Sequence, residues 1–142
     1  MEAEAFETVF DPIRGLRVKL TPEERVRQAY VDYLLHTLGY PADLIANEAA
    51  IRVGKTLRRC DTVVFSPRDR TPLMVLEYKA PEVPVTERTL RQALEYNSVL
   101  GAKAIVVTNG RVMSVLKVSG DGSAPAPAEA LPTFEELCSD DF

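Results

Sequence analysis

The stretch LMVLEYKAP, Leu73–Pro81, decides the fold and raises the question of function. It begins with apolar residues typical of a strand buried in a sheet. It ends with Glu77, Tyr78 and Lys79. Side chains alternate along a strand, so Glu77 and Lys79 point to one face while Tyr78 points to the other. A buried strand that ends with a carboxylate and an ammonium on one face is a candidate site.

The residues that follow this strand predict a parallel neighbour. An amphipathic helix is expected over Thr86–Leu100, and the apolar run KAIVVTN, Lys103–Asn109, then suits a second buried strand. A strand, a crossover helix and a strand form a unit whose two strands run parallel. Asn109-Gly110 then predicts a hairpin turn into a last strand over Arg111–Val118.

The residues that precede the quoted strand predict antiparallel partners for it. Strands are expected over Leu44–Val53 and Arg58–Phe65, joined by a hairpin-like turn at Gly54. The loop SPRDRTP leads from the second of them into the quoted strand. Together these connections predict an α/β domain, with a mixed β-sheet flanked by helices.

The N-terminal part predicts a turn, a short strand and a helix. The turn and strand are expected over Phe10–Leu20. Thr21 is then a helix N-cap, with Pro22 in the first helical position and Glu24 completing a capping box. The helix is expected to run to about Leu38, with one apolar face.

Asp61 adds chemistry to this architecture. If the strand that contains it pairs antiparallel with the quoted strand, Asp61 lies beside Glu77. Two carboxylates this close repel each other, and a divalent cation relieves the repulsion most easily. Bound Mg²⁺ or Mn²⁺ accepts phosphate oxygens and lowers the pKa of a water, and Lys79 beside that water can orient it or stabilise developing charge. The pattern predicts phosphodiester hydrolysis.

Two further side chains are candidates for the same site. Glu24 offers a third metal-binding carboxylate from the first helix, although its place in the capping box explains it equally well. Gln92 offers an amide from the second helix, and a solvated helix residue is the alternative. The basic cluster, defined as Arg52, Lys55, Arg58 and Arg59, flanks the first hairpin turn and is either a solvated loop or a phosphate contact.

The composition limits the class of protein. The 142 residues, of which 46% are hydrophobic, are enough for one domain with a core. We expect that domain over residues 1–118, followed by a linker and acidic C-terminal tail over 119–142. The formal net charge is −4, yet residues 51–118 hold twice as many basic as acidic residues, so a positive face toward nucleic acid stays open.

No apolar run approaches the roughly 20 residues needed to cross a membrane. With two cysteines and no basic, apolar leader, a cytoplasmic location is expected.

The motifs resemble a known family. RRCDTVVF followed by LEYKAP resembles the D…ExK signature of the PD-(D/E)xK nuclease superfamily. LTPEERVRQ, GYP, these two blocks, RQALEYN and VVTNG together resemble, in order, the N-terminal nuclease-like domain of type I restriction enzyme R (HsdR) subunits. The resemblance covers roughly Phe10–Val118. It implies a restriction-endonuclease-like core and an endonuclease that hydrolyses DNA with Mg²⁺.

The resemblance also implies roles for single residues. Asp61 and Glu77 match the metal-binding acids, Lys79 the catalytic lysine, Glu24 the acidic residue of the first helix and Gln92 the glutamine motif after ExK. Two features depart from the pattern. Cys60 stands where the superfamily's name-giving proline is expected, and in R subunits this domain precedes an ATP-driven motor that 142 residues are too few to contain.

Three alternatives stay open at this point. The chain is a stand-alone DNA nuclease, a non-catalytic protein that keeps the nuclease fold to bind nucleic acid or a partner, or one subunit of a larger restriction-modification system. A homodimer is a further open partner, because one site per chain cuts one strand at a time.

Overall fold

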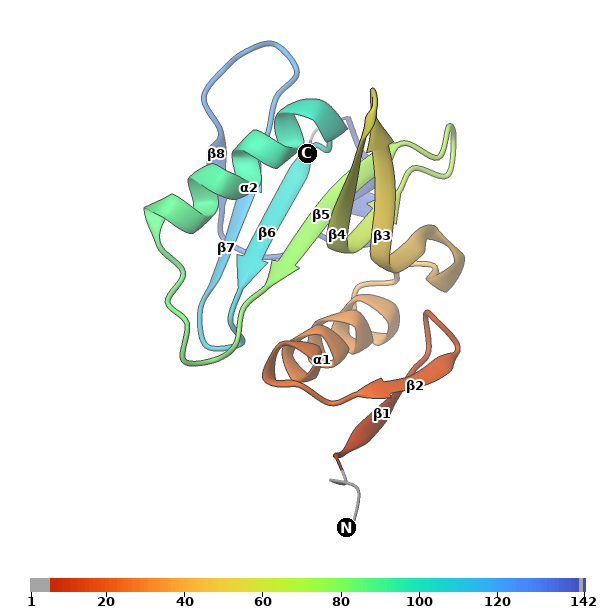
Figure 1. Cartoon of the computed structure of the whole chain (residues 1–142). Coiled ribbons are helices and arrows are strands. Elements are labelled where there is room, and N and C mark those ends of the chain that lie inside the picture. Colours follow the sequence, from red (N-terminus) through yellow and green to blue (C-terminus); the bar gives the residue numbers. More distant parts are fainter. Residues whose placement is uncertain (1–5, 141) are drawn as a thin grey trace.

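The quoted strand lies inside a six-stranded mixed sheet (Figure 1). The computed structural model describes residues 6–140 and residue 142. The strands are β1 Thr8–Asp11, β2 Leu16–Lys19, β3 Ile45–Val53, β4 Thr56–Phe65, β5 Pro72–Tyr78, β6 Ala104–Thr108, β7 Met113–Lys117 and β8 Ala126–Ala128. The helices are α1 Pro22–His36, the short 3₁₀ helix η1 Ala42–Leu44, α2 Glu87–Leu100 and α3 Phe134–Cys138.

The connections of the main sheet agree with the prediction. The strand order is β3-β4-β5-β6-β7-β8. β4 pairs antiparallel with β3 and with β5, whereas β5 and β6, joined through α2, run parallel. β6 and β7 form the antiparallel hairpin expected at Asn109-Gly110. The mixed α/β fold class is therefore confirmed.

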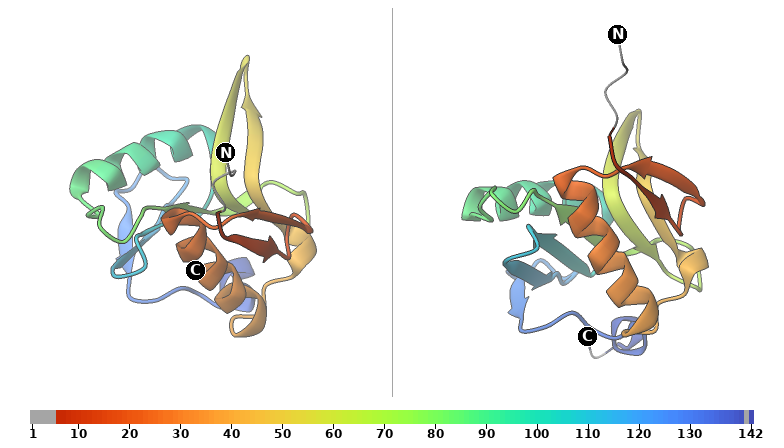
Figure 2. Two further views of the ribbon diagram at one scale, coloured as in Figure 1. Left: turned by 60° about the horizontal axis from the view of Figure 1, so that its bottom comes forward. Right: turned by 90° about the horizontal axis from the view of Figure 1, so that it is seen from below.

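Helices α1 and α2 cover opposite faces of this sheet (Figure 2). Alternate residues of β5 and β6 show this, because Leu76 and Val106 belong to the core under α1. Ile105 and Val107 instead pack against α2. β6 is buried along its whole length, as expected of a parallel strand with helices on both sides. The Glu77 side chain, one residue from Leu76, therefore faces α2.

The N-terminal segment differs from the prediction of one short strand. It forms a two-stranded antiparallel hairpin, β1–β2, that is separate from the main sheet. The turn between the strands uses Gly15 at φ 69° and the buried side chain of Asp11, which accepts the backbone N–H of Ile13 at 2.8 Å. This hairpin lies against α1 (Figure 2).

Helix α1 begins where expected and ends two residues earlier. The Thr21 hydroxyl accepts the backbone N–H of Glu24 at 3.0 Å, which is one half of the predicted capping box. The Glu24 carboxylate does not return to the cap and binds elsewhere, as described below. The helix ends at His36 because Gly39, at φ 75°, turns the chain, and the backbone N–H of Tyr40 bonds Leu34 O at 2.9 Å.

The predicted linker and tail over 119–142 contain two elements of the domain. β8 pairs antiparallel with β7, with Pro127 opposite Leu116, and so extends the main sheet. α3 contributes the fully buried Leu137 to the core under α1. The Tyr40 hydroxyl donates to Pro132 O at 2.9 Å, which fixes this segment to the end of α1. The described domain thus continues past residue 118.

Among the described residues, no helix is both long enough and apolar enough to cross a bilayer.

Candidate active site

Asp61 and Glu77 lie next to each other on β4 and β5. The last residues paired between these strands are Thr62 and Leu76. One step further along the same antiparallel register places Asp61 opposite Glu77. Side chains that are opposite each other in an antiparallel pair lie on the same face. The structure therefore brings the two carboxylates together, as the sequence predicts.

Two hydrogen bonds hold Asp61 in place. Its Oδ2 accepts the backbone N–H of Tyr78 at 2.9 Å. Its backbone carbonyl accepts Nη1 of Arg27, from α1, at 2.7 Å. The Asp61 carboxylate thus binds an N–H of β5 where the backbone pairing of β4 and β5 ends. Contacts from β5 and from α1 together fix its position next to Glu77.

Glu77 has an unusually high pKa. Burial of the side chain, the negative charge of Asp61 and a side-chain hydrogen bond with Asp61 raise the pKa of Glu77 to about 8. The charge of Lys79 and a backbone hydrogen bond with Asp61 oppose this rise. At neutral pH the two carboxyl groups therefore hold a proton between them, since two adjacent negative charges are unfavourable. A divalent cation provides another way to neutralise the pair.

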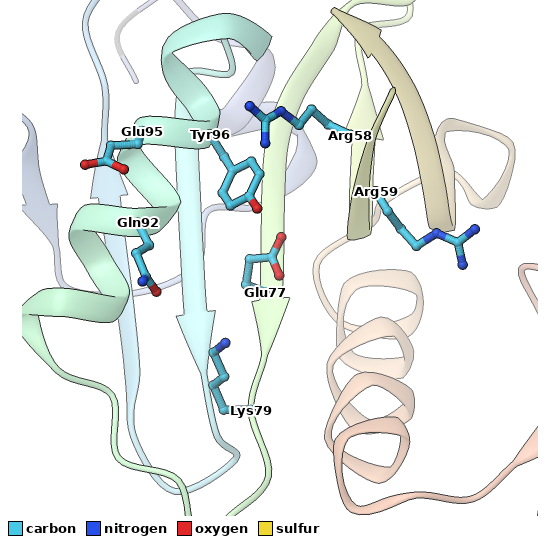
Figure 3. A pocket seen from close by; sticks show the side chains of 7 residues that line it. All are labelled: Arg58, Arg59, Glu77, Lys79, Gln92, Glu95 and Tyr96. Carbon is cyan, nitrogen blue, oxygen red and sulfur yellow. The ribbon is translucent and has the colours of Figure 1, made fainter. Parts of the chain in front are cut away.

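A cavity of about 500 Å³ opens in front of Glu77 (Figure 3). It lies between the end of β5, α2 and the hairpin β3–β4. Its lining consists of Arg58, Arg59, Glu77, Lys79, Gln92, Glu95 and Tyr96. In Figure 3 the Lys79 ammonium and the Gln92 amide are both directed into the space between α2 and the end of β5. Three of the predicted side chains, Glu77, Lys79 and Gln92, thus share one cavity.

The backbone explains why Lys79 faces the same side as Glu77. The N–H of Lys79 bonds Thr108 O of β6 at 2.8 Å, so the extended conformation continues one residue past the end of β5. The alternation of side chains therefore still applies at Lys79. Among the described residues, Lys79 forms no ion pair within 4.0 Å, so its ammonium is available to a ligand.

Glu24 is not part of this site. Its Oε1 accepts Nη2 of Arg14 at 2.8 Å and Nη2 of Arg27 at 2.9 Å. Its Oε2 accepts Nε of Arg27 at 3.0 Å and the Gln28 amide at 2.7 Å. Burial disfavours its charge, yet these partners hold the pKa of Glu24 below its ordinary value. Among the described residues, no group of three or more His, Cys, Asp or Glu side chains could hold a metal ion. The geometry gives no support to Glu24 as a third metal ligand.

Sequence reasoning missed Arg27, which connects the two faces of the sheet. Its side chain is 8% exposed and pairs with Glu24 and with Glu48 Oε1, the latter at 2.7 Å, besides holding the Asp61 carbonyl. Burial lowers the pKa of Arg27, but its two glutamate partners outweigh burial and raise it. A signal was present, because Arg27 follows Glu24 by three residues on one side of α1.

Glu48 occupies a strained backbone position opposite Asp61. Its φ of 54° lies in the left-handed region, which costs a non-glycine residue about 1 kcal/mol. By the register of β3 and β4, a regular strand would direct Glu48 to the same face as Asp61. The pair with Arg27 shows that the side chain turns to α1 instead, and so does not join Asp61 and Glu77.

A chain of buried hydrogen bonds supports the site from behind. The Tyr78 hydroxyl donates to Thr62 Oγ1 at 3.0 Å, and the Thr62 hydroxyl donates to Asn47 Oδ1 at 2.7 Å. The Asn47 amide donates to Asp11 Oδ2 at 3.1 Å. Burial opposes ionisation of Asp11, but hydrogen bonds from Arg14 and Asn47 keep its pKa below the ordinary value. The β1–β2 hairpin is thereby joined to the strands that carry the acidic pair.

Comparisons with known proteins agree with this architecture. The family model described as type I restriction enzyme R protein N terminus matches residues 22–132. A solved structure, a fragment assigned as the HsdR subunit of a type I restriction enzyme from Vibrio vulnificus YJ016, is similar with a TM-score of 0.59 and 24% sequence identity. The match covers 83% of this chain and 24% of that one, so this chain spans about a quarter of its length. At this identity the likeness shows the fold alone.

A second solved structure is less similar. It is the type IIG restriction endonuclease BpuSI, with a TM-score of 0.46 and 20% identity over 71% of this chain and 11% of that one. No curated protein matches the chain.

Proposed function

Since this chain belongs to the family of type I restriction enzyme R protein N termini, we propose that it hydrolyses phosphodiester bonds of DNA with Mg²⁺ or Mn²⁺. One observation carries the proposal. The carboxylates of Asp61 and Glu77 meet on one face of the sheet, and burial together with their repulsion raises the pKa of Glu77 to about 8 at a cavity that Lys79 also lines. A strained pair of this kind is a preformed place for a divalent cation.

The donor set suits magnesium. Mg²⁺ is usually held by one or two carboxylates together with waters and substrate phosphate oxygens, rather than by a closed set of protein ligands. Asp61 and Glu77 supply the two carboxylates, and the cavity in front of Glu77 leaves room for the remaining ligands. When bound, the cation supplies a Lewis acid for a phosphate oxygen and lowers the pKa of a water.

Lys79 and Gln92 act on the substrate side of the pair. The Lys79 ammonium forms no ion pair within 4.0 Å among the described residues, so it is free to bind a non-bridging phosphate oxygen and stabilise the charge that develops there. The same ammonium can hold the attacking water by a hydrogen bond. Gln92 offers both a donor and an acceptor from α2, and orients the water or the phosphate within the same cavity.

Cleavage of supercoiled plasmid DNA tests the proposal. In Mg²⁺ or Mn²⁺, Lys79→Ala should lower the nicking rate at least about 100-fold, the usual cost of losing one charge-stabilising group. Asp61→Asn should have an effect of similar size, and it retains an oxygen that accepts the Tyr78 N–H. Lys19→Ala, which removes an exposed ammonium from β2, is the matched control and should cleave like the wild type. Equal nicking by all four proteins would identify the activity as contamination.

Calorimetric titration with Mg²⁺ separates catalysis from simple binding. Asp61→Asn should abolish the uptake of Mg²⁺, whereas Lys79→Ala should retain it while losing cleavage. A chain that binds DNA but takes up no Mg²⁺ through these carboxylates would instead be a non-catalytic protein with a nuclease fold.

A further inference from the structure

The hairpin formed by β3 and β4 extends beyond the body of the domain (Figures 1 and 2). Cys60 is buried in a hydrophobic cluster, and Ile51, which pairs with Arg58, is the last residue toward the turn that packs against this cluster. Thr56–Arg59 are all exposed, and Leu57 keeps 59% of its surface in water. Two-stranded ribbons without a packed face are marginally stable on their own. This part of the hairpin is here called the arm (residues 50–59), and of its side chains Ile51 packs against the core.

The arm carries the basic cluster that the sequence analysis left open. Arg52 and Lys55 are exposed, and neither forms an ion pair with any described residue. Arg58 is held over the ring of Tyr96, with its Cζ 4.9 Å from the ring centroid. Arg59 lies 3.7 Å from Glu48, and its side chain is 72% exposed. The cations of the cluster are thus at most weakly neutralised by acidic side chains of the described residues.

The cluster continues directly from the candidate active site. Arg58 and Arg59 line the same cavity as Glu77 and Lys79 (Figure 3). Five residue steps along β4 separate Asp61 from Thr56 at the turn, which is about 17 Å at the rise of a strand. The same distance along duplex DNA is about five base pairs at about 3.4 Å each.

From this arrangement we propose that the arm binds duplex DNA next to the point of cleavage. A two-stranded ribbon fits the major groove of B-DNA, and cations on it reach the phosphates of the groove walls. Arg52 and Lys55 bind phosphates away from the scissile bond, while Arg58 binds a phosphate at the mouth of the cavity. This inference rests on the proposed function, because it takes DNA as the substrate of the site.

Fluorescence anisotropy with a labelled 20-base-pair duplex tests the arm. Ca²⁺ replaces Mg²⁺ in the assay because it accepts the same kind of oxygen ligands. Arg52→Ala/Lys55→Ala should raise the Kd about tenfold or more. It should also reduce the slope of log K against log salt by about 2, since each phosphate contact contributes about 0.9.

Two matched variants distinguish the effect of the arm from the effects of net charge and of altered folding. Arg25→Ala/Arg68→Ala removes the same charge from exposed positions on α1 and on the β4–β5 loop, and should leave the slope unchanged. Arg52→Lys/Lys55→Arg keeps the charge on the arm and should bind like the wild type. Equal weakening by both alanine variants, or no weakening by the arm variant, would overturn the inference. So would an equal loss of affinity for a single strand of the same length.

Cleavage assays keep the two proposals distinct. The arm variant should raise KM and leave kcat unchanged, whereas Lys79→Ala should lower kcat far more than it changes the Kd for DNA. If the wild type does not cleave DNA but the arm variant still binds it more weakly, the proposed hydrolysis is wrong and the proposed DNA binding by the arm is supported. If Lys79→Ala abolishes cleavage but the arm variant binds like the wild type, the arm fails and the function stands.

Discussion

Two groups of buried or half-buried carboxylates lie on opposite faces of one sheet, and they have opposite electrostatics. On the α1 side, Glu24 receives four hydrogen bonds from Arg14, Arg27 and Gln28, and its pKa is lowered. On the α2 side, Glu77 is buried and meets another carboxylate, and its pKa rises to about 8. Neutralised charge on the first side serves the fold. Carboxyl groups with a raised pKa, as on the second side, cluster at functional sites.

The largest effect on stability is expected on the neutralised side. Arg27→Met should lower the free energy of unfolding by about 3–5 kcal/mol, because it leaves Glu24 buried with one cation fewer. It also removes the donor to the Asp61 carbonyl. Arg25→Met is the control on the same helix, since that side chain is 69% exposed, and it should cost less than about 0.5 kcal/mol. Urea denaturation measures both, and similar values would mean that the α1 cluster contributes little.

On the α2 side, removal of the carboxylate charge of Glu77 should instead raise the free energy of unfolding, and this effect depends on pH. The pKa of Glu77 is about 8 in the folded protein against an ordinary 4.5, so the folded state holds the extra proton. Its contribution to stability is fully present below about pH 4.5 and is lost as the pH rises through about 8. The slope attains at most about 1.4 kcal/mol per pH unit.

Glu77→Gln isolates this contribution. The variant should be less sensitive to pH than the wild type between about pH 5 and 8, and more stable than the wild type at the upper end. Glu95→Gln changes a carboxylate that lines the same cavity and should keep the wild-type dependence. Denaturant titrations at several pH values give the comparison. A wild-type curve parallel to that of Glu77→Gln would show that the two carboxylates do not share a proton.

The smallest expected effect is the pH dependence of Mg²⁺ binding by Asp61 and Glu77. Mg²⁺ must displace the shared proton, so its affinity should rise with pH by at most about tenfold per unit and level off above about pH 8. Titration calorimetry in buffers with different ionisation enthalpies should detect the release of up to about one proton per Mg²⁺ bound. Binding that is independent of pH and releases no proton would place the cation away from Glu77.

The sequence predicted those features of the site that follow from the alternation of side chains along a strand and from simple connections between neighbouring elements. Glu77 and Lys79 share a face because strands alternate, and Asp61 falls opposite Glu77 because the connection to β5 is a simple antiparallel one. Gln92 reaches the cavity from the crossover helix that the βαβ unit requires.

The sequence could not predict the features that depend on distant partners. The role of Glu24 is fixed by Arg14, ten residues earlier, across a hairpin that has no clear pattern of its own. β8 was missed for the same reason, and so was the packing of α3 against the core, because the Ala- and Pro-rich segment that contains β8 shows no periodicity. Their place is set by contacts such as that between Tyr40 and Pro132, 92 residues apart.

The short outermost strand β8 also bears on self-association. It is three residues long, and Pro127 at its middle has no N–H to offer to an incoming strand. This border of the sheet is therefore protected against growth by strand addition. Two copies of the chain that joined their sheets into one continuous sheet would have to meet through β3, and would then compete with DNA for the arm.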